Sequence, residues 1–226
     1  MRLLLISSSN VHGYGYLDHA EAEIRRVLEG RRSVAFVPFA LKNHDAYTDK
    51  VRERLGRMEF DVTQVRTADD IANAEAIFIG GGNTFRLLEH LYDGGFVDAI
   101  RDRVRNGHAP YIGSSAGTNV ATLSIRTTND MPIVYPPTFD ALGFVSFQIN
   151  PHYLDPDPNS THKGETREDR IREFHEENDT PVIGLREGSM LRVEDGVATL
   201  IGEKTARIFR RGQEPFELAA GSPVEV

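Results

Sequence analysis

Short apolar runs alternate with amphipathic stretches along the first two-thirds of the chain. The runs that have the length and composition of buried strands are Arg2–Ser7, Ser33–Val37, Val62–Arg66, Ala76–Ile79 and Pro110–Ile112. Such an alternation is typical of βαβ units, in which successive strands lie parallel and the connecting segments cross over a face of the sheet. We therefore predict an α/β protein with a parallel sheet.

Helices are predicted between these strands. Apolar residues recur every three or four positions in Leu17–Glu29 and in the segment 47–58, which places them on one face of a helix. Thr84–Tyr92 and Phe96–Arg105 have the same periodicity. These helices are expected to cover the sheet.

The pattern changes after about residue 124. A segment rich in Thr, Asn and Pro runs through 127–137 and is predicted to be an irregular loop. Regular structure resumes with a strand at Phe147–Asn150, a helix at Glu165–Glu177 and a buried strand at Val182–Leu185. The last forty residues are predicted to form short strands in antiparallel hairpins. We find neither an internal repeat nor a linker, so residues 1–226 are expected to form one domain.

The charge of the chain narrows the classes of function. Lys and Arg total 26 against 34 Asp and Glu, which gives a net charge of −8. Such a field repels nucleic acids and anionic membrane surfaces, so we expect no partner of either kind. No apolar run reaches the roughly 18 residues of a membrane span, and the first residues lack a signal-peptide pattern. A cytoplasmic protein is therefore expected.

The sequence contains no cysteine. Disulfides, thiolate nucleophiles and cysteine zinc sites are therefore excluded, and any chemistry must use Ser, Thr, Asp, Glu, Lys or His. No cofactor is expected.

The strongest local motif is Gly113–Gly117, with the sequence GSSAG. It follows the strand Pro110–Ile112 and precedes a helix-compatible segment, which is the context of a nucleophile elbow. The motif makes Ser115 the candidate nucleophile and the N–H of Ala116 a candidate oxyanion donor. A plain strand-to-helix turn built of small residues would explain the motif equally well.

A second glycine-rich segment, Gly80–Phe85 (GGGNTF), also follows a strand and opens a helix. It lacks the lysine of a phosphate-binding loop and the spacing of a dinucleotide motif. Because neighbouring parallel strands end at the same edge of a sheet, Gly81, Gly82 and Asn83 are candidates for the other half of the oxyanion hole. The alternative is a tight turn that requires a positive φ.

Among eight histidines, His152 is the candidate general base, because it follows a predicted strand and the turn-like Asn150-Pro151. The alternative is a hydrogen-bonded structural histidine. A metal site built from His152, Asp155 and Asp157 is also conceivable, but their spacing matches no zinc or calcium loop. We therefore expect no metal.

The imidazole of a triad needs a carboxylate that orients it. Asp130, in the irregular loop, and Glu187, just after the strand Val182–Leu185, are the two candidates. Ser115, Asp130 and His152 have the chain order of the α/β-hydrolases. Ser115, His152 and Glu187 would be a permutation of the same roles, and the sequence does not decide between them.

Together these segments resemble the peptidase E family, the aspartyl dipeptidases among the serine peptidases, which is related to cyanophycinase. The matching segments are Gly80–Phe85 (GGGNTF), Tyr111–Gly117 (YIGSSAG), Ile125–Val134 (IRTTNDMPIV), Gln148–His152 (QINPH), His162–Ile171 (HKGETREDRI) and Val182–Gly188 (VIGLREG). The segments Ser33–Ala40 and Tyr47–Lys50 extend the likeness towards the N-terminus. One position departs from the family pattern, because Ser114 stands where an aromatic residue is expected.

The resemblance implies a fold and an activity. The implied fold is a three-layer α/β sandwich with a mostly parallel central sheet, similar to class I glutamine amidotransferases and flavodoxin-like, followed by C-terminal β-hairpins. The implied activity is hydrolysis of dipeptides with an N-terminal aspartate, with Ser115 as nucleophile and His152 as base and then acid. Asp130 is taken as the orienting carboxylate, with Glu187 as its competitor.

An aspartyl substrate calls for a fixed cation, and arginine suits it because its guanidinium can bind both carboxylate oxygens. Arg167, one residue after the predicted helix cap Thr166, is the first choice. The expected partner is thus a small acidic dipeptide, and the chain is expected to be a monomer or a homodimer. The alternative functions are a cyanophycinase-like hydrolase of β-linked Asp-Arg material and a non-catalytic ligand-binding module.

Overall fold

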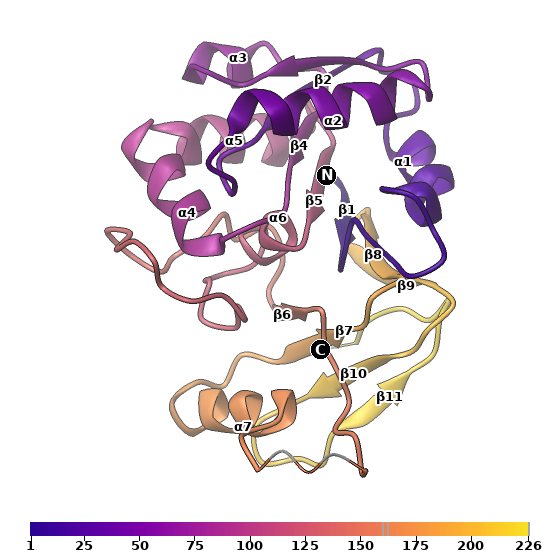
Figure 1. Cartoon of the computed structure of the whole chain (residues 1–226), viewed down its shortest axis with the longest axis vertical. Helices are drawn as coiled ribbons and strands as arrows, with labels where there is room; N and C mark the ends of the chain where they lie inside the picture. Colours follow the sequence, from indigo (N-terminus) through magenta and orange to yellow (C-terminus); the bar gives the residue numbers. More distant parts are fainter. Residues whose placement is uncertain (160, 162, 226) are drawn as a thin grey trace.

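The computed structural model describes residues 1–159, 161 and 163–225, so His162, the first residue of one matching segment, lies outside the described residues. A seven-stranded sheet with the order β3-β2-β4-β5-β1-β8-β9 forms the centre of the upper half of the molecule (Figure 1). Its strands are β1 (Arg2–Ile6), β2 (Ser33–Val37), β3 (Asp61–Gln64), β4 (Ile77–Ile79), β5 (Tyr111–Ser114), β8 (Ser189–Glu194) and β9 (Val197–Gly202).

The first five of these strands pair in parallel, as the alternating sequence pattern predicted. β8 pairs antiparallel with β1, and β8 and β9 form a hairpin. Because side chains alternate along a strand, Leu3 and Leu5 of β1 face one core and Leu4 and Ile6 face the other. Apolar residues on both faces explain why this strand has a continuous apolar run.

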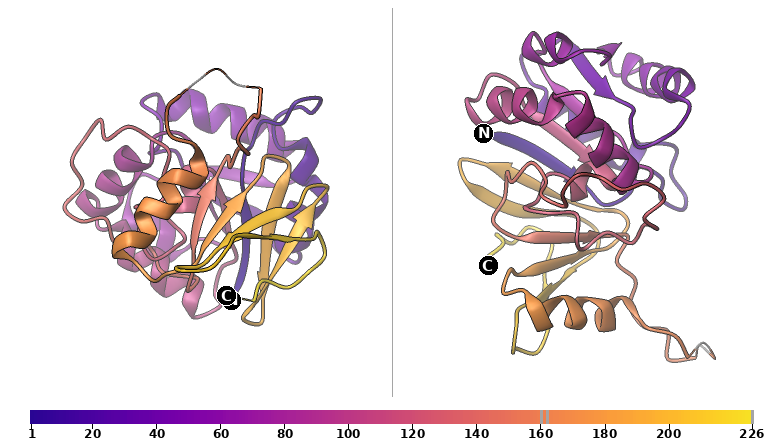
Figure 2. Two further views of the ribbon diagram at one scale, coloured as in Figure 1. Left: turned by 90° about the horizontal axis from the view of Figure 1, so that it is seen from below. Right: turned by 90° about the vertical axis from the view of Figure 1, so that its left-hand side faces the viewer.

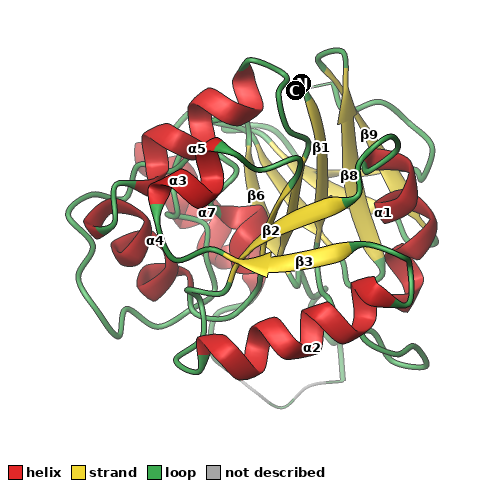
Figure 3. Cartoon of the chain, turned by 90° about the horizontal axis from the view of Figure 1, so that it is seen from above, coloured by secondary structure: helices red, strands yellow, loops and turns green. Residues whose placement is uncertain are grey.

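Helices cover both faces of the sheet (Figure 3). The core that contains Leu4 is covered by α1 (Glu21–Val27), which follows a 3₁₀ turn at Asp18–Ala20, and by α2 (His44–Gly56). The core that contains Leu3 is covered by α3 (Ala68–Ala72), α4 (Thr84–Asp93) and α5 (Phe96–Arg105). The three-layer α/β architecture is therefore confirmed.

A second, four-stranded sheet lies below the first (Figures 1 and 2). Its order is β11-β10-β7-β6, and α7 (Arg167–Glu177) packs on it through Ile171. Its strands are β6 (Gln148–Pro151), β7 (Val182–Leu185), β10 (Ala206–Phe209) and β11 (Phe216–Leu218). The sequence predicted β6, β7 and the antiparallel hairpins, but nothing in it indicated that they form a separate sheet.

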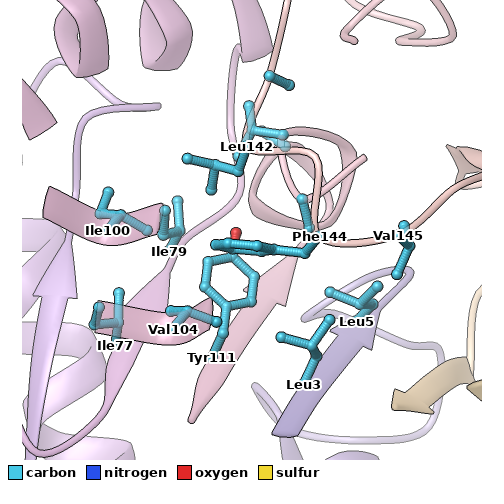
Figure 4. Packing of buried hydrophobic residues seen from close by; sticks show 14 of the residues in the cluster. Leu3, Leu5, Ile77, Ile79, Ile100, Val104, Tyr111, Leu142, Phe144 and Val145 are labelled. Carbon is cyan, nitrogen blue, oxygen red and sulfur yellow. The ribbon is translucent and has the colours of Figure 1, made fainter. Parts of the chain in front are cut away.

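One core joins the two sheets. Ile149 of β6 and Ile183 of β7 belong to the same buried cluster as Leu5 of β1. Within this cluster the ring of Tyr111 packs against Phe144 at a centroid distance of 5.2 Å (Figure 4). The Tyr111 hydroxyl donates a 2.5 Å hydrogen bond to the carbonyl oxygen of Gly117 in the short helix α6 (Ala116–Asn119). Tyr111 thereby connects α6 to the buried cluster.

Within the described residues, no helix combines the length and the apolar composition that crossing a membrane requires.

The close packing of α6 against β4 predicts that a side chain at Gly117 destabilises the protein. A Cβ at Gly117 would overlap the carbonyl oxygen of Ile79, so Gly117→Ala should lower the free energy of unfolding by roughly 2 kcal/mol or more. Gly56→Ala is the matched control, because a Cβ there meets nothing within 4 Å. At this helix end the substitution should leave the free energy of unfolding unchanged or raise it by up to about 1 kcal/mol. Urea unfolding of both variants measures the difference, and equal stabilities would contradict this account of the packing.

Candidate active site

Ser115 stands on a strained turn between β5 and α6. Its φ of 53° and ψ of −107° are rare for a residue with a side chain. The flanking glycines are required by close approach, because a Cβ at Gly113 would lie 2.5 Å from the carbonyl oxygen of Gly117. The Ser115 N–H donates to the carbonyl oxygen of Ile6 on β1, which holds the turn in place. This is the geometry that the GSSAG motif predicted for a nucleophile elbow.

Ser114, the position that departs from the family pattern, is fully buried at the end of β5. Its hydroxyl makes no hydrogen bond within residues 1–159, 161 and 163–225. The side chain of Ser114 therefore points into the protein, away from the exposed edge on which Ser115 lies.

His152 comes from the second sheet, directly after β6, and lies beside Ser115. Its Nε2 is 2.8 Å from Oγ of Ser115, and its Nδ1 is 2.6 Å from Oε1 of Glu187. The His152 N–H donates to Oγ of Ser7, and the Ser7 hydroxyl donates to the carbonyl oxygen of Leu185. These contacts hold the backbone of His152, which has a φ of 53°, against the ends of β1 and β7.

Glu187, not Asp130, contacts His152. The carboxylate of Asp130 accepts hydrogen bonds from the N–H and the hydroxyl of Thr84, at 2.7 and 2.6 Å, at the start of α4. A third bond comes from the hydroxyl of Thr128. The expected order Ser115, Asp130, His152 thus does not match the geometry, because Asp130 is held on a different element. It still lines the same pocket as Ser115 and His152.

The glycine-rich segment after β4 lies against Ser115, as expected of an oxyanion hole. A Cβ at Gly81 would lie 3.0 Å from Cβ of Ser115, so the backbone comes close to the nucleophile here. In the part of the chain that the structure describes, the N–H groups of Gly82 and Ala116 make no hydrogen bond and remain available to an anion.

Asn83 does not fit the role expected of it. Its N–H donates to the carbonyl oxygen of Ala40, and its side-chain amide donates to the carbonyl oxygen of Met131. Its side-chain oxygen accepts from the N–H of Arg86 and caps α4. Asn83 is therefore a helix cap that also anchors the irregular loop. The N–H of Gly81 donates to the hydroxyl of Tyr47, so Gly82 and Ala116 remain the candidates for the oxyanion hole.

A pocket of about 390 Å³ opens above Ser115 and His152. Besides the expected residues it is lined by residues from the segment after β1 and from α2 that were not among the predicted site residues: Ser8, Ser9, Asn10, Tyr16, Tyr47 and Lys50. The run Ser7-Ser8-Ser9-Asn10 at the end of the first predicted strand was the available signal, because ligands bind at that edge of a parallel sheet. Burial raises the pKa of both Tyr16 and Tyr47, so these hydroxyls stay neutral.

Arg167 begins α7 and lines an adjacent pocket of about 560 Å³. The preceding Thr166 and Asp169 form the capping box that their spacing predicted. Arg170 and Arg172 pair with Glu165 and Glu168, whereas Arg167 has no carboxylate within 4 Å in the described part of the chain.

Burial lowers the pKa of Arg167, the neighbouring Arg170 adds to this shift, and Asp130 opposes it. Arg167 therefore lies within electrostatic range of Asp130. Arg167 itself lines the pocket beside Asn129, whereas Asp130 lines the pocket over Ser115.

The three residues considered for a metal site, His152, Asp155 and Asp157, bind other partners. Both carboxylate oxygens of Asp155 accept from the guanidinium of Arg186, at 2.6 and 2.8 Å. Asp157 accepts from the N–H of Asn159 in its own turn. His152 is bonded to Ser115 and Glu187 as described, so these three side chains do not converge.

Comparison with known proteins bears on the family and the fold. Residues 3–201 match the model of peptidase family S51. Peptidase E of Streptomyces coelicolor is 58% identical over 226 residues, which cover 98% of this chain and 93% of that protein. A probable alpha-aspartyl dipeptidase of Drosophila melanogaster is 50% identical over 223 residues, with 96% and 93% covered. The crystal structure of a peptidase from an acI-B1 actinobacterium has a TM-score of 0.71 at 18% identity, with 100% and 96% covered, and supports the fold.

The contacts of His152 predict which carboxylate matters for the reactivity of Ser115. Glu187→Gln removes the charge that stabilises a protonated imidazole, so labelling of Ser115 by a fluorophosphonate should slow by roughly 100-fold or more. Asp130→Asn should slow it less than about tenfold, since Asp130 contacts Thr84 instead. Mass spectrometry of the labelled serine gives the rates. A larger loss in the Asp130 variant would contradict the assignment to Glu187.

Proposed function

The chain belongs to peptidase family S51, and on that premise we propose that it hydrolyses dipeptides with an N-terminal aspartate through a covalent acyl-enzyme on Ser115. The observation that carries this proposal is the hydrogen-bonded chain from Ser115 through His152 to Glu187. A nucleophile, a base and a carboxylate in this geometry are the parts of a serine hydrolase triad. A ligand-binding module would need none of them.

The proposed reaction has two steps. Ser115 Oγ attacks the peptide carbonyl carbon, and its proton passes to Nε2 of His152 while the N–H groups of Gly82 and Ala116 stabilise the oxyanion. The C–N bond then breaks, and His152 returns the proton to the leaving amine. His152 then deprotonates a water molecule, whose oxygen attacks the acyl carbon. The bond between this carbon and Oγ of Ser115 breaks, His152 returns the proton to Oγ, and aspartate is released. Glu187 accepts from Nδ1 throughout and stabilises the imidazolium.

The charges around Ser115 support an N-terminal aspartate. Asp130 offers a carboxylate to the free α-ammonium group, because its bonds from Thr84 and Thr128 all fall on Oδ2. Arg167, which has no carboxylate partner among the described residues, is the proposed ligand of the aspartyl side chain. The name alpha-aspartyl dipeptidase, carried by the Drosophila relative, agrees with this substrate.

For the compartment we propose the cytoplasm, and for the assembly a monomer or a homodimer. The proposed compartment agrees with a sequence that has no apolar run of membrane-spanning length.

The substrate class is tested with the dipeptides Asp-Leu, Glu-Leu, Asn-Leu and Ala-Leu. The wild-type protein should cleave Asp-Leu alone, with or without a chelator, and Ser115→Ala should lose roughly 10⁴-fold or more of this activity. Amino-acid release measured by chromatography checks both expectations. If the wild type cleaves none of the four, the proposal fails, and β-linked Asp-Arg substrates or a binding role become the alternatives. Loss of activity with the chelator would favour a metal-dependent hydrolase.

The role of Arg167 predicts a loss of substrate affinity. Arg167→Gln should lower kcat/KM for Asp-Leu by roughly 10- to 100-fold, mainly through KM, because a charged hydrogen bond to the aspartyl side chain is lost. Arg172→Gln is the matched control on the same helix, since Arg172 pairs with Glu168. Steady-state kinetics separate KM from kcat. Equal kinetics in the Arg167 variant and the wild type would remove Arg167 from the site.

A further inference from the structure

The pocket over Ser115 receives side chains from both faces of the seven-stranded sheet. Tyr16 and α2 pack on the core that contains Leu4, and α4, to which Asp130 is bonded, packs on the core that contains Leu3. The helices α2 and α4 therefore lie on opposite faces of the sheet. Ser115, at the end of a central strand, lies between the two sides. A substrate bound across this edge therefore meets different residues at its two ends.

Lys50 is the one lysine or arginine among the described residues that line this pocket. Its Nζ lies 4.1 Å from the ring centroid of Tyr16, a cation–π distance. Within residues 1–159, 161 and 163–225, Lys50 has no carboxylate within 4 Å, although both arginines of α2, Arg52 and Arg54, pair with one. Tyr47, one turn earlier on the same helix, is buried. Lys50 is therefore an exposed cation on α2 that has no ion pair among the described residues and lines the same pocket as Ser115.

A dipeptide with an N-terminal aspartate carries three charges at neutral pH: an α-ammonium, a side-chain carboxylate and a C-terminal carboxylate. Asp130, which is bonded to the start of α4, matches the α-ammonium, and Arg167, proposed above as the ligand of the aspartyl side chain, matches the side-chain carboxylate. Both of these charges belong to the residue that is acylated, so the leaving residue extends toward the other side. There the described lining residues offer one cation, Lys50.

We propose that Lys50 binds the C-terminal carboxylate of the leaving residue and so selects dipeptides over longer peptides. This inference rests on the proposed function. The carboxylate of a dipeptide is one residue beyond the scissile bond, which is about 3.8 Å measured between Cα atoms. In a longer peptide this position holds a neutral amide, which leaves Lys50 without its charge partner, and further residues must fit in the same pocket.

The experiment compares Asp-Leu with Asp-Leu amide, which differ only in the charge of the C-terminus. Lys50→Met should lower kcat/KM for Asp-Leu by roughly 10- to 100-fold, mainly through KM, and change that for Asp-Leu amide by less than about twofold. The wild type should prefer Asp-Leu, and the variant should lose this preference. Lys50→Arg, which keeps the charge, should recover most of the activity on Asp-Leu.

Lys42→Met is the matched control. Lys42 is also an exposed lysine, but it lines a separate surface depression near the start of α2. Its replacement by methionine therefore removes the same charge without changing the pocket over Ser115. Both substrates should be cleaved by this variant as by the wild type.

Several outcomes would overturn the inference. An equal loss on both substrates in Lys50→Met would mean that Lys50 serves the aspartyl side chain or the reacting groups. No loss on either would remove it from the site. In both cases cleavage by the wild type leaves the proposed function intact. If the wild type cleaves neither substrate, the proposed function itself fails, and the role of Lys50 fails with it.

Discussion

The hydroxyl of Ser7 is the link on which the site depends. Ser115 ends a strand of the seven-stranded sheet, whereas His152 and Glu187 follow strands of the four-stranded sheet. Ser7, fully buried at the end of β1, accepts from the N–H of His152 and donates to the carbonyl oxygen of Leu185. One side chain thus fixes the base and the segment that carries its carboxylate relative to the sheet that carries the nucleophile. Because the buried hydroxyl both donates and accepts a hydrogen bond, it favours one arrangement of the two sheets over others.

Two non-glycine residues of the site have positive φ, Ser115 and His152, both at 53°. Conformations of this kind cost about 1–3 kcal/mol each and persist where the surroundings enforce them. At Ser115 the enforcement comes from the close packing of α6 on Ile79 and from the bond to Ile6. At His152 it comes from Ser7. With these backbone conformations the side chains of Ser115 and His152 meet, with Oγ of Ser115 2.8 Å from Nε2 of His152.

Glu187 is held through its neighbour in the sequence. Arg186 has a side chain that is only 13% exposed, and it binds Asp155 from the segment after His152 and Glu217 from β11. These two carboxylates raise the pKa of Arg186 above its ordinary value. In a chain with a net charge of −8, the ion pairs join the segments on both sides of the contact between His152 and Glu187. Lys50 and Arg167, the cations proposed to bind the substrate, make no such ion pair within the described residues and line the two pockets of the site.

The sequence by itself determined the local elements and made Ser115 and His152 the candidate nucleophile and base. Strand β2 and helix α5 have the predicted bounds, because the period of apolar residues is a property of neighbouring positions in the chain. GSSAG predicted the elbow for the same reason, since its glycines are needed within the turn itself. Only the tertiary structure decided that β6 and β7 leave the central sheet and that Glu187 reaches His152 while Asp130 binds Thr84. The tertiary structure also decided that the side-chain amide of Asn83 donates to the carbonyl oxygen of Met131 and that Lys50 lines the pocket over Ser115. These outcomes depend on contacts between segments distant in the chain, which no local pattern of residues encodes.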